Sequence, residues 1–316
     1  MFNFFITRPL GFIIKLIYDL VQNYGLAIIF FTIIVKLLLM PLTVKSQKAM
    51  KKQQKIQPYL QELQAKYKDD PQKLQQETMK LYKENNISMA GGCLPLLIQF
   101  PILISLYSVI RKPLTYLLGI DFNLAENLTK VGEIVKTMNE RYPDVIGKLA
   151  KLDPVDIVKN YEIQISTWCS ELNFTEWVMD FDFLGLDLSV TPVTGLNYLL
   201  SFNFSSPDRL MLIIIPLLAV FTTWISMKLS QKMSGQQLQD AENNPAASMS
   251  KSMNLMMPIM TGFFAFTLPS GIGLYWIASN VMQLIQQLLI DMYFKNKGDD
   301  FDVKLPERNT NKRKKR

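Results

Sequence analysis

The sequence predicts an all-α polytopic membrane protein: five transmembrane helices around a hydrophilic groove, with an N-terminal interfacial helix and a cytoplasmic helical hairpin. Three observations lead there. Hydrophobic residues make up 49% of the 316 residues and gather in long runs with almost no charge. Charged residues gather in the segments between those runs. One lysine and a stripe of polar residues nevertheless lie inside the apolar runs. A soluble domain mixes both kinds of residue by periodicity instead.

The predicted spans follow from the length of the apolar runs, since a bilayer core needs about 20 apolar residues in a helix. Gly25–Leu42 holds one charge, and Leu94–Ile110 and Leu210–Met227 hold none. Ser252–Ile290 is also uncharged but is about twice as long as one membrane-spanning helix. A proline and two glycines near position 270 indicate that it forms two spans joined by a tight turn. The predicted spans are 24–44, 93–112, 209–229, 252–268 and 270–294.

Charges between the spans predict their orientation. Residues 43–88, which include the predicted hairpin segment 45–88, hold ten Lys and five acidic residues, a net charge of +5. Segment 113–208 has six basic and fourteen acidic residues, a net of −8, and tail 295–316 has nine basic and four acidic, a net of +5. The acidic segment is therefore expected outside the cell. The N-terminus is expected outside, and loop 230–251 and the C-terminus in the cytoplasm.

Residues 1–23 have an amphipathic pattern. Apolar residues from Phe2 to Val21 recur at helical spacing, while Arg8, Lys15 and Asp19 fall on the other side. This pattern predicts a helix lying in the membrane interface. A cleaved signal peptide is the alternative, although charges interrupt the apolar run and no small-residue cleavage site follows.

Two helices are predicted within 45–88. Ile56, Leu60, Leu63 and Tyr67 form one narrow apolar seam, and a weaker seam runs from Leu74 to Tyr82. The Asp-Asp-Pro sequence at 69–71 is a turn followed by a helix start, and Pro58 is expected to kink or restart the first helix. The alternative is a solvated charged loop. The hairpin would dock a cytoplasmic partner or anionic lipid headgroups.

The segments 113–208 and 295–316 have weaker sequence patterns, from which fewer functional predictions follow. Helices are expected near Leu124–Arg141 and Pro154–Leu172, and Trp177–Leu200 is expected to skim the outer interface. The basic end of the tail, Lys312–Arg316, would bind ribosomal RNA or anionic lipid through phosphates. The alternative is a solvated tail that serves only topology.

Lys36 is the strongest single signal. A charge deep in a span costs about 2.5–3.5 kcal/mol on insertion scales. Lys36 lies nine residues before Lys45, about 13.5 Å along a helix, which its side chain cannot reach. The spans carry no interior acidic partner. We therefore infer a hydrated cavity open to the cytoplasm, with a snorkelling lysine in a thinned bilayer as the alternative.

Other polar residues share helix faces in the spans. Trp276, Asn280 and Gln283 follow i, i+4, i+7, and Gln287 continues the stripe. Gln99 and Tyr107 share a face of the second span, and Thr32 lies one turn before Lys36. These residues, with Lys36, predict a shared hydrated groove, with ordinary helix–helix contacts as the alternative. Five methionines between 249 and 260 suit either an adaptable apolar surface or plain packing.

Composition excludes several kinds of site. The chain has no histidine, so a Ser-His-Asp triad and an H-E-x-x-H zinc site are excluded. Cys93 and Cys169 are expected on opposite sides of the membrane and cannot pair within the chain. No phosphate-binding G-x-x-x-x-G-K-[ST] motif occurs. No catalytic residue, metal or cofactor is predicted.

The ordered motifs resemble those of the YidC family of membrane protein insertases, across residues 1–294. They are TIIVKLLLMP from Thr32, QQETMKLYKENN from Gln75, GCLPLLIQFPILISLY from Gly92, LDLS from Leu186, SMNLMMPIM from Ser252 and GLYWIASN from Gly273.

The resemblance implies a groove closed outside and open to the cytoplasm and lipid. It implies a multi-pass protein of the bacterial plasma membrane that inserts nascent membrane proteins, alone or beside the Sec translocon, with the ribosome as a further partner. The family's groove cation, usually arginine, falls on Lys36, and its groove Gln and Trp fall on Gln99 and Trp276. The expected form is short, without a large outer domain before the first span.

Two other function classes compete with an insertase. A small-solute transporter often shows inverted repeats and broken helices, and neither is visible here. An intramembrane enzyme would need interior His, Asp or Glu residues or a Ser-Lys pair, and the predicted spans of this chain carry none of these in their interior.

Overall fold

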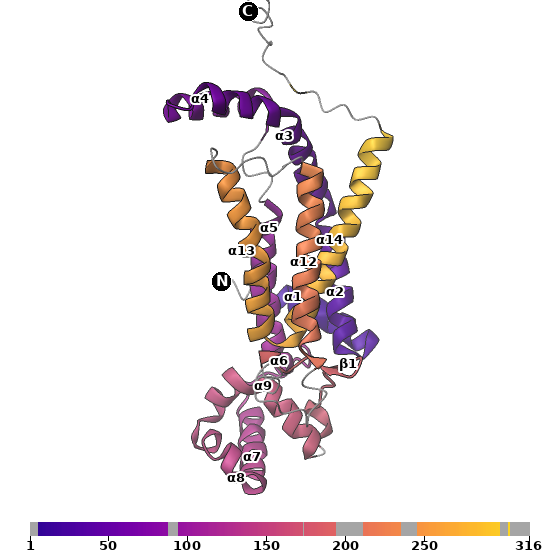
Figure 1. Cartoon of the computed structure of the whole chain (residues 1–316). Helices are drawn as coiled ribbons and strands as arrows, with labels where there is room; N and C mark the ends of the chain where they lie inside the picture. Colours follow the sequence, from indigo (N-terminus) through magenta and orange to yellow (C-terminus); the bar gives the residue numbers. More distant parts are fainter. Residues whose placement is uncertain are drawn as a thin grey trace, which may run out of the picture. The chain divides into compact units, whose positions relative to one another are not determined.

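The structure, a computed structural model, describes residues 6–87, 94–172, 174–193, 211–234, 245–297 and 303. It is mostly helical (Figure 1), as predicted. The chain divides into two compact units. Unit 1 comprises 1–37, 98–223 and 257–282, and unit 2 comprises 38–97, 224–256 and 283–316.

Helix α1, Arg8–Val21, is amphipathic as expected for the predicted interfacial helix. Gly11, Ile14 and Tyr18 form its buried face. It ends at Gln22, which adopts φ 50° and donates its N–H to the Tyr18 carbonyl at 2.8 Å. This left-handed residue closes the helix and lets α2, Tyr24–Leu38, begin in a new direction.

The helix predicted over 24–44 is interrupted at Leu39. Helix α3, Met40–Lys66, starts there with Pro41 in its first turn. Proline lacks an N–H for the preceding turn and disfavours a helical residue before it, so the break falls here. Pro58, by contrast, does not restart α3, which continues through it. Its side chain is exposed, so solvent can satisfy the carbonyl it leaves unbonded.

In unit 2, helix α4, Pro71–Glu84, folds back on α3 as predicted for a helical hairpin. The Asp70 side chain accepts a hydrogen bond from the Lys73 N–H at 3.0 Å and caps α4. Ile56 and Leu60 of α3 pack with Leu81 and Tyr82 of α4. Leu63 of α3 packs against this core, whereas Leu74 of α4 is not part of it.

An ion pair also joins α3 to the last helix within unit 2. Asp291 of α14, Ser270–Asn296, pairs with Lys51 and with Lys295, the latter at 2.9 Å. Because Lys51 and Asp291 are only 20% and 16% exposed, solvent screens this pair less than a surface pair.

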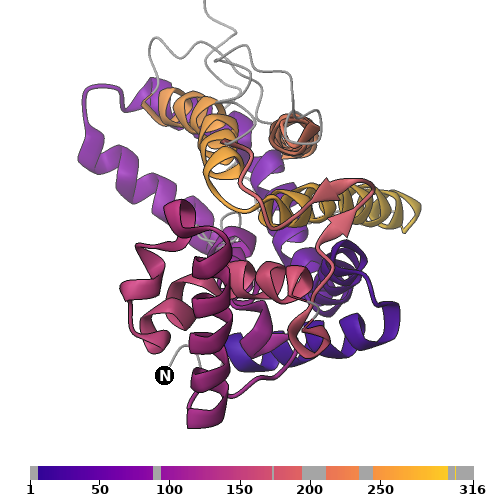
Figure 2. The ribbon, with the colours of Figure 1, turned by 90° about the horizontal axis from the view of Figure 1, so that it is seen from below.

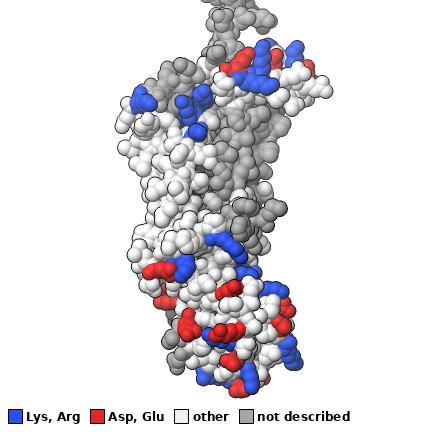
Figure 3. All heavy atoms as spheres, turned by 180° about the vertical axis from the view of Figure 1, so that it is seen from behind, with Lys and Arg blue, Asp and Glu red and all other residues white. Residues whose placement is uncertain are grey.

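Segment 113–193 of unit 1 folds into a cluster of helices, which we call the α6–α9 cluster (Figures 1 and 2). Its core contains Val131, Met138, Ile165 and Trp168. Figure 3 shows acidic and basic side chains interspersed over this cluster. Its helices are α6 (Pro113–Tyr116), α7 (Ala125–Arg141), α8 (Pro143–Ile146), η2 (Leu149–Lys151), α9 (Pro154–Glu171) and η3 (Thr175–Trp177).

A short β-hairpin in unit 1 was not predicted. Strand β1, Asp182–Phe183, pairs antiparallel with β2, Leu186–Asp187. Leu184 and Gly185 form the turn with φ values of 56° and 78°. The Leu188 and Val190 carbonyls, just after β2, accept the Gly271 and Ser270 N–H groups that begin α14. The hairpin therefore caps a helix start whose N–H groups have no partner within the helix.

Helices occupy all five ranges predicted as spans, but the count of five stays a prediction. Among described residues, α12 alone is long and apolar enough by itself to cross a membrane, over Ile214–Gln231, and α2 with α3 qualifies if the pair is one span. α5 and α13 contain shorter apolar stretches. Their bounds are Leu94–Arg111 for α5, Ile214–Ser234 for α12 and Pro245–Thr267 for α13. The break between α13 and α14 falls at Leu268 and Pro269.

Small residues allow close packing in unit 1. A Cβ added at Gly25 of α2 would overlap the Phe183 ring, and one added at Gly273 of α14 would lie 2.5 Å from Ile215 Cγ2 of α12. Glycine at helix contacts lets backbones approach, which is how helices associate in a bilayer. These contacts bring α2 against the hairpin and α14 against α12.

Candidate functional site

The predicted cation, Lys36, lies in the last turn of α2 and is partly buried. The neighbouring positions Phe31 and Val35 are buried apolar residues. Thr32, predicted beside it, is 1% exposed and donates its hydroxyl to the Ile28 carbonyl at 2.7 Å. The Thr32 hydroxyl therefore has its hydrogen-bond partner within its own helix.

Gln99 of α5 contacts α14 within unit 1, at a residue that lies beside the predicted stripe and is not part of it. The Gln99 side-chain amide donates to the Tyr275 hydroxyl. Tyr275 is 1% exposed and precedes Trp276, whose ring stacks on Phe264 of α13 at 6.4 Å between centroids. Tyr275 was missed by the sequence analysis. The available signal was a tyrosine in an apolar run, because its hydroxyl needs a partner when buried.

Asn280 makes contact between helices, the alternative interpretation of the polar stripe. Its side-chain amide donates to the hydroxyls of Thr222 at 3.1 Å and Thr223 at 2.8 Å on α12. In hydrocarbon, polar groups of this kind are satisfied by neighbouring helices. Asn280 therefore joins α14 to α12, and its side chain is partly committed to that contact.

The other predicted groove residues are spread over several environments. Tyr107 of α5 accepts a hydrogen bond from the Arg111 guanidinium at 2.9 Å, at the exposed end of that helix. Gln283 is partly buried on α14 and belongs to unit 2, unlike the other six predicted groove residues. Gln287, one turn further, is 4% exposed. The structure thus joins Gln99 to α14, whereas Lys36, Tyr107 and Gln283 belong to three different helices, α2, α5 and α14.

The predicted methionine cluster, Cys93 and the basic tail are described only in part. Met256 and Met260 of α13 are 63% and 40% exposed, while residues 249 and 253 lie outside the described side chains. Cys93 and Lys312–Arg316 also lie outside the described residues. Among those described, no group of three or more His, Cys, Asp or Glu is placed to hold a metal ion.

Comparison with known proteins identifies the chain. The sequence model of the family described as "60Kd inner membrane protein" matches residues 16–297. A protein of Caldanaerobacter subterraneus subsp. tengcongensis named "Membrane protein insertase YidC" is 31% identical over 284 residues, which are 90% of this chain and 93% of that one. The chain belongs to the YidC family.

Two clostridial YidC proteins are similar over comparable lengths. The protein of Clostridium perfringens is 31% identical over 89% of this chain and 84% of its own. That of Clostridium tetani is 31% identical over 88% of this chain and 86% of its own. Both are named membrane protein insertases. The chain therefore matches YidC family members from its first predicted span to its last.

Proposed function

We propose that this YidC family member is a membrane protein insertase and chaperone of the bacterial membrane. The observation that carries the proposal is the family match over 16–297, together with insertase relatives matched over 84–93% of their length. A solute transporter, the competing interpretation, has no support among these relatives.

The site of insertion is a groove among the five predicted spans, open to the cytoplasm and to lipid. Its proposed lining is Lys36, Gln99, Trp276, Thr32, Tyr107, Asn280 and Gln283. Support comes from the contact between Gln99 and Tyr275, which brings polar groups of α5 and α14 together inside unit 1. Two polar side chains at such a contact can exchange their mutual hydrogen bond for bonds to a client's polar backbone.

Lys36 attracts the polar or acidic tail of an incoming client in this mechanism. A charge pair at 4 Å is worth about 1–4 kcal/mol for effective dielectric constants of 80 to 20, which suffices for capture and still permits release. Most family members are expected to carry arginine here. Lysine retains the charge as long as its ammonium group stays hydrated.

The client's own hydrophobicity drives its release sideways into lipid. Each Leu, Ile, Phe or Val at mid-membrane contributes about 0.3–0.6 kcal/mol on insertion scales. A segment of 20 such residues therefore needs no nucleotide to favour the bilayer. The groove's role is to lower the barrier for the polar tail, which would otherwise cross hydrocarbon unsatisfied.

The proposed topology places the N-terminus outside, and hairpin α3–α4 and the C-terminus in the cytoplasm. The hairpin and the basic tail would then meet ribosomes, nascent chains, the Sec translocon and anionic lipid. The hairpin's ten lysines against five acidic residues favour phosphate-rich partners.

Substitution of Lys36 tests the mechanism. In cells depleted of the native insertase, Lys36→Arg should sustain insertion, whereas Lys36→Ala should impair clients with acidic outer tails more than clients with neutral ones. Lys148→Ala, which removes one exposed charge from the α6–α9 cluster, is the control. Protein abundance is measured in parallel. Equal loss for both client classes at normal abundance would remove Lys36 from client capture.

A photocrosslinking residue tests whether clients occupy the groove. Placed at Gln99, it should react with a ribosome-bound membrane protein during translation. Placed at Phe100, about 100° around the same helix, it should react less with the client and more with lipid. Equal client crosslinking from both positions would contradict a defined groove on the Gln99 face.

A further inference from the structure

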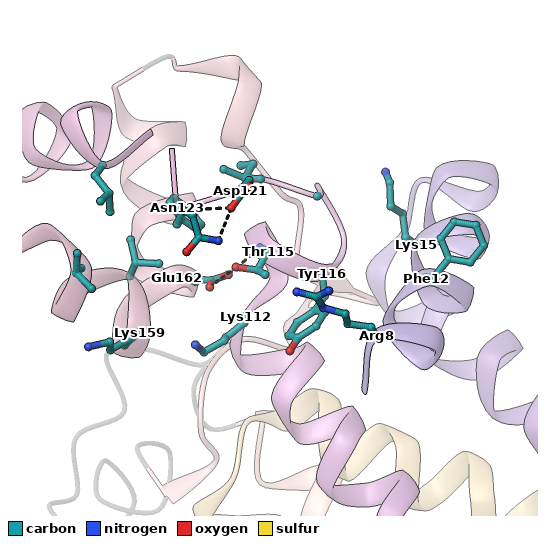
Figure 4. Close-up of a pocket in the computed structure, with 16 residues that line it drawn as sticks. Arg8, Phe12, Lys15, Lys112, Thr115, Tyr116, Asp121, Asn123, Lys159 and Glu162 are labelled. Atoms are coloured by element: carbon teal, nitrogen blue, oxygen red, sulfur yellow. Dashed lines mark hydrogen bonds between the residues drawn. The ribbon is translucent and has the colours of Figure 1, made fainter. Parts of the chain in front are cut away.

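A second polar site lies within unit 1, apart from the proposed groove. It is a pocket of about 550 Å³ between α1, α6, the loop after α6 and α9 (Figure 4). Arg8 and Lys15 enter it from α1, Lys112 from the start of α6, and Lys159 from α9. These positions are far apart in sequence, so only the folded unit brings the four cations together.

The charge of this pocket suits an anion. Its lining holds four basic side chains and two acidic ones, Asp121 and Glu162, a difference of +2. Both carboxylates already accept hydrogen bonds within the protein. Glu162 accepts from the Thr115 N–H at 2.9 Å and its hydroxyl at 2.6 Å, and Asp121 accepts from the Asn123 N–H at 2.9 Å and its amide at 2.7 Å (Figure 4).

Ion pairs at the rim do not neutralise the site. Lys15 pairs with Asp19 and Lys159 with Asp156, each at 3.1 Å. The side chains of these pairs are between 34% and 59% exposed. Exposed pairs of this kind are worth about 0–1 kcal/mol, so an entering phosphate can replace the carboxylate partner.

An apolar stripe leads away from the pocket along α1. Phe12, which also lines the pocket, Leu16 and Leu20 are spaced four residues apart and are 61%, 54% and 84% exposed. Residues at this spacing share one helix face. A soluble anion would have no use for such a stripe, whereas acyl chains would cover it.

We propose that this pocket binds the phosphate headgroup of an anionic phospholipid whose acyl chains lie along Phe12, Leu16 and Leu20. The lipid would join α1 to the α6–α9 cluster through one molecule, with its phosphate among Arg8, Lys112 and Lys159. The head and the chains are recognised by different parts of the unit, so each part can be tested separately. The proposal does not depend on insertase activity.

The headgroup is tested with the full chain in a neutral detergent. Binding of dioleoyl-phosphatidylglycerol and dioleoyl-phosphatidylcholine is measured by native mass spectrometry. The wild type should prefer the anionic lipid. Lys112→Gln should weaken its binding about fivefold, as should each of the exposed changes Arg8→Gln and Lys159→Gln, which corresponds to about 1 kcal/mol per charge. Lys136→Gln on α7, outside the pocket, is the matched control and should leave binding unchanged.

The acyl part is tested with Leu16→Ser against Leu152→Ser, a control at an exposed leucine outside the stripe. Leu16→Ser should weaken lipid binding several-fold and leave binding of soluble glycerol 3-phosphate unchanged. No loss with the pocket charges removed, or equal loss with Lys136→Gln, would overturn the headgroup site. Tight binding of glycerol 3-phosphate with no effect of Leu16→Ser on lipid would show a soluble phosphate site and overturn the lipid.

Discussion

Glu162 should make the stability of the α6–α9 cluster depend on pH. Its side chain is 1% exposed, and burial raises its pKa from the ordinary 4.5 to about 7, although hydrogen bonds from Thr115 and the charge of Lys112 act in the opposite direction. The folded pKa lies above the unfolded one, so the folded state binds the proton more tightly. The contribution of Glu162 to stability is therefore fully present below pH 4.5 and is lost as pH rises to about 7.

The size of the effect follows from the pKa difference. The folded and unfolded pKa values differ by about 2.5, and a difference of one in pKa corresponds to about 1.36 kcal/mol. The free energy of unfolding of the cluster should fall by about 3 kcal/mol in total, most of it between pH 5 and pH 8. A loss of this size is a large part of the stability of a small helical cluster.

Hydrogen exchange at the Thr115 amide measures this change directly, because that N–H donates to Glu162. The full chain is kept in a zwitterionic detergent so that no anionic lipid contributes. Protection, corrected for the intrinsic effect of pH on exchange, should be greater at pH 5 than at pH 8. Glu162→Gln should make protection independent of pH.

The Gln variant should also change the order of stability with pH. At pH 5 it should be about as stable as the wild type, because its amide oxygen can accept from the Thr115 N–H and its amide nitrogen can donate to the Thr115 hydroxyl oxygen. At pH 8 the variant should be more stable than the wild type, because no charge is buried. Glu140→Gln, an exposed change on α7, should keep the wild-type dependence. Equal wild-type protection at both pH values would refute the reasoning.

Four further outcomes are expected. Cys169 is fully buried and burial raises its pKa to about 12, so thiol reagents should not label it until the cluster unfolds. A cysteine at Lys151 should react from outside the cell and one at Gln75 from the cytoplasm, and labelling of both from one side would contradict the topology. Asn280→Leu removes the bonds to α12 and one polar side chain of the proposed groove, so it should lower stability by about 1 kcal/mol in thermal unfolding and also reduce insertion at matched abundance; unchanged insertion would leave Asn280 a helix–helix contact only. Deleting 304–316 should weaken ribosome association and its steep salt dependence, and unchanged association would leave the tail a role in topology only.

The sequence by itself determined which parts of the chain are helical and which are apolar. The predicted stretch Leu124–Arg141 corresponds to α7 and Pro154–Leu172 to α9, because helical periodicity and helix-starting residues are local signals. The hairpin α3–α4 followed for the same reason, from its apolar seams and the Asp-Asp-Pro turn. The YidC family resemblance likewise rested on motifs that can be seen in order along the chain.

Local signals predicted helix boundaries less reliably at the two prolines Pro41 and Pro58. Pro58 was expected to kink or restart its helix, yet α3 continues through it, and the helix boundary lies instead at Leu39, before Pro41. The sequence shows where a proline removes a hydrogen bond. Whether the helix bends there depends on what its neighbours can satisfy, which is a property of the packed structure.

Tertiary structure alone decided which polar groups meet. Neither the β1–β2 hairpin against the start of α14 nor the Gln99–Tyr275 contact has a local signature, since each depends on which faces of distant segments come together. The same holds for Asn280, whose position on a polar stripe was visible but whose threonine partners on α12 were not. The four cations around Glu162 come from three segments more than 100 residues apart at their extremes. Periodicity along one helix specifies a face, but only packing between helices specifies what that face touches.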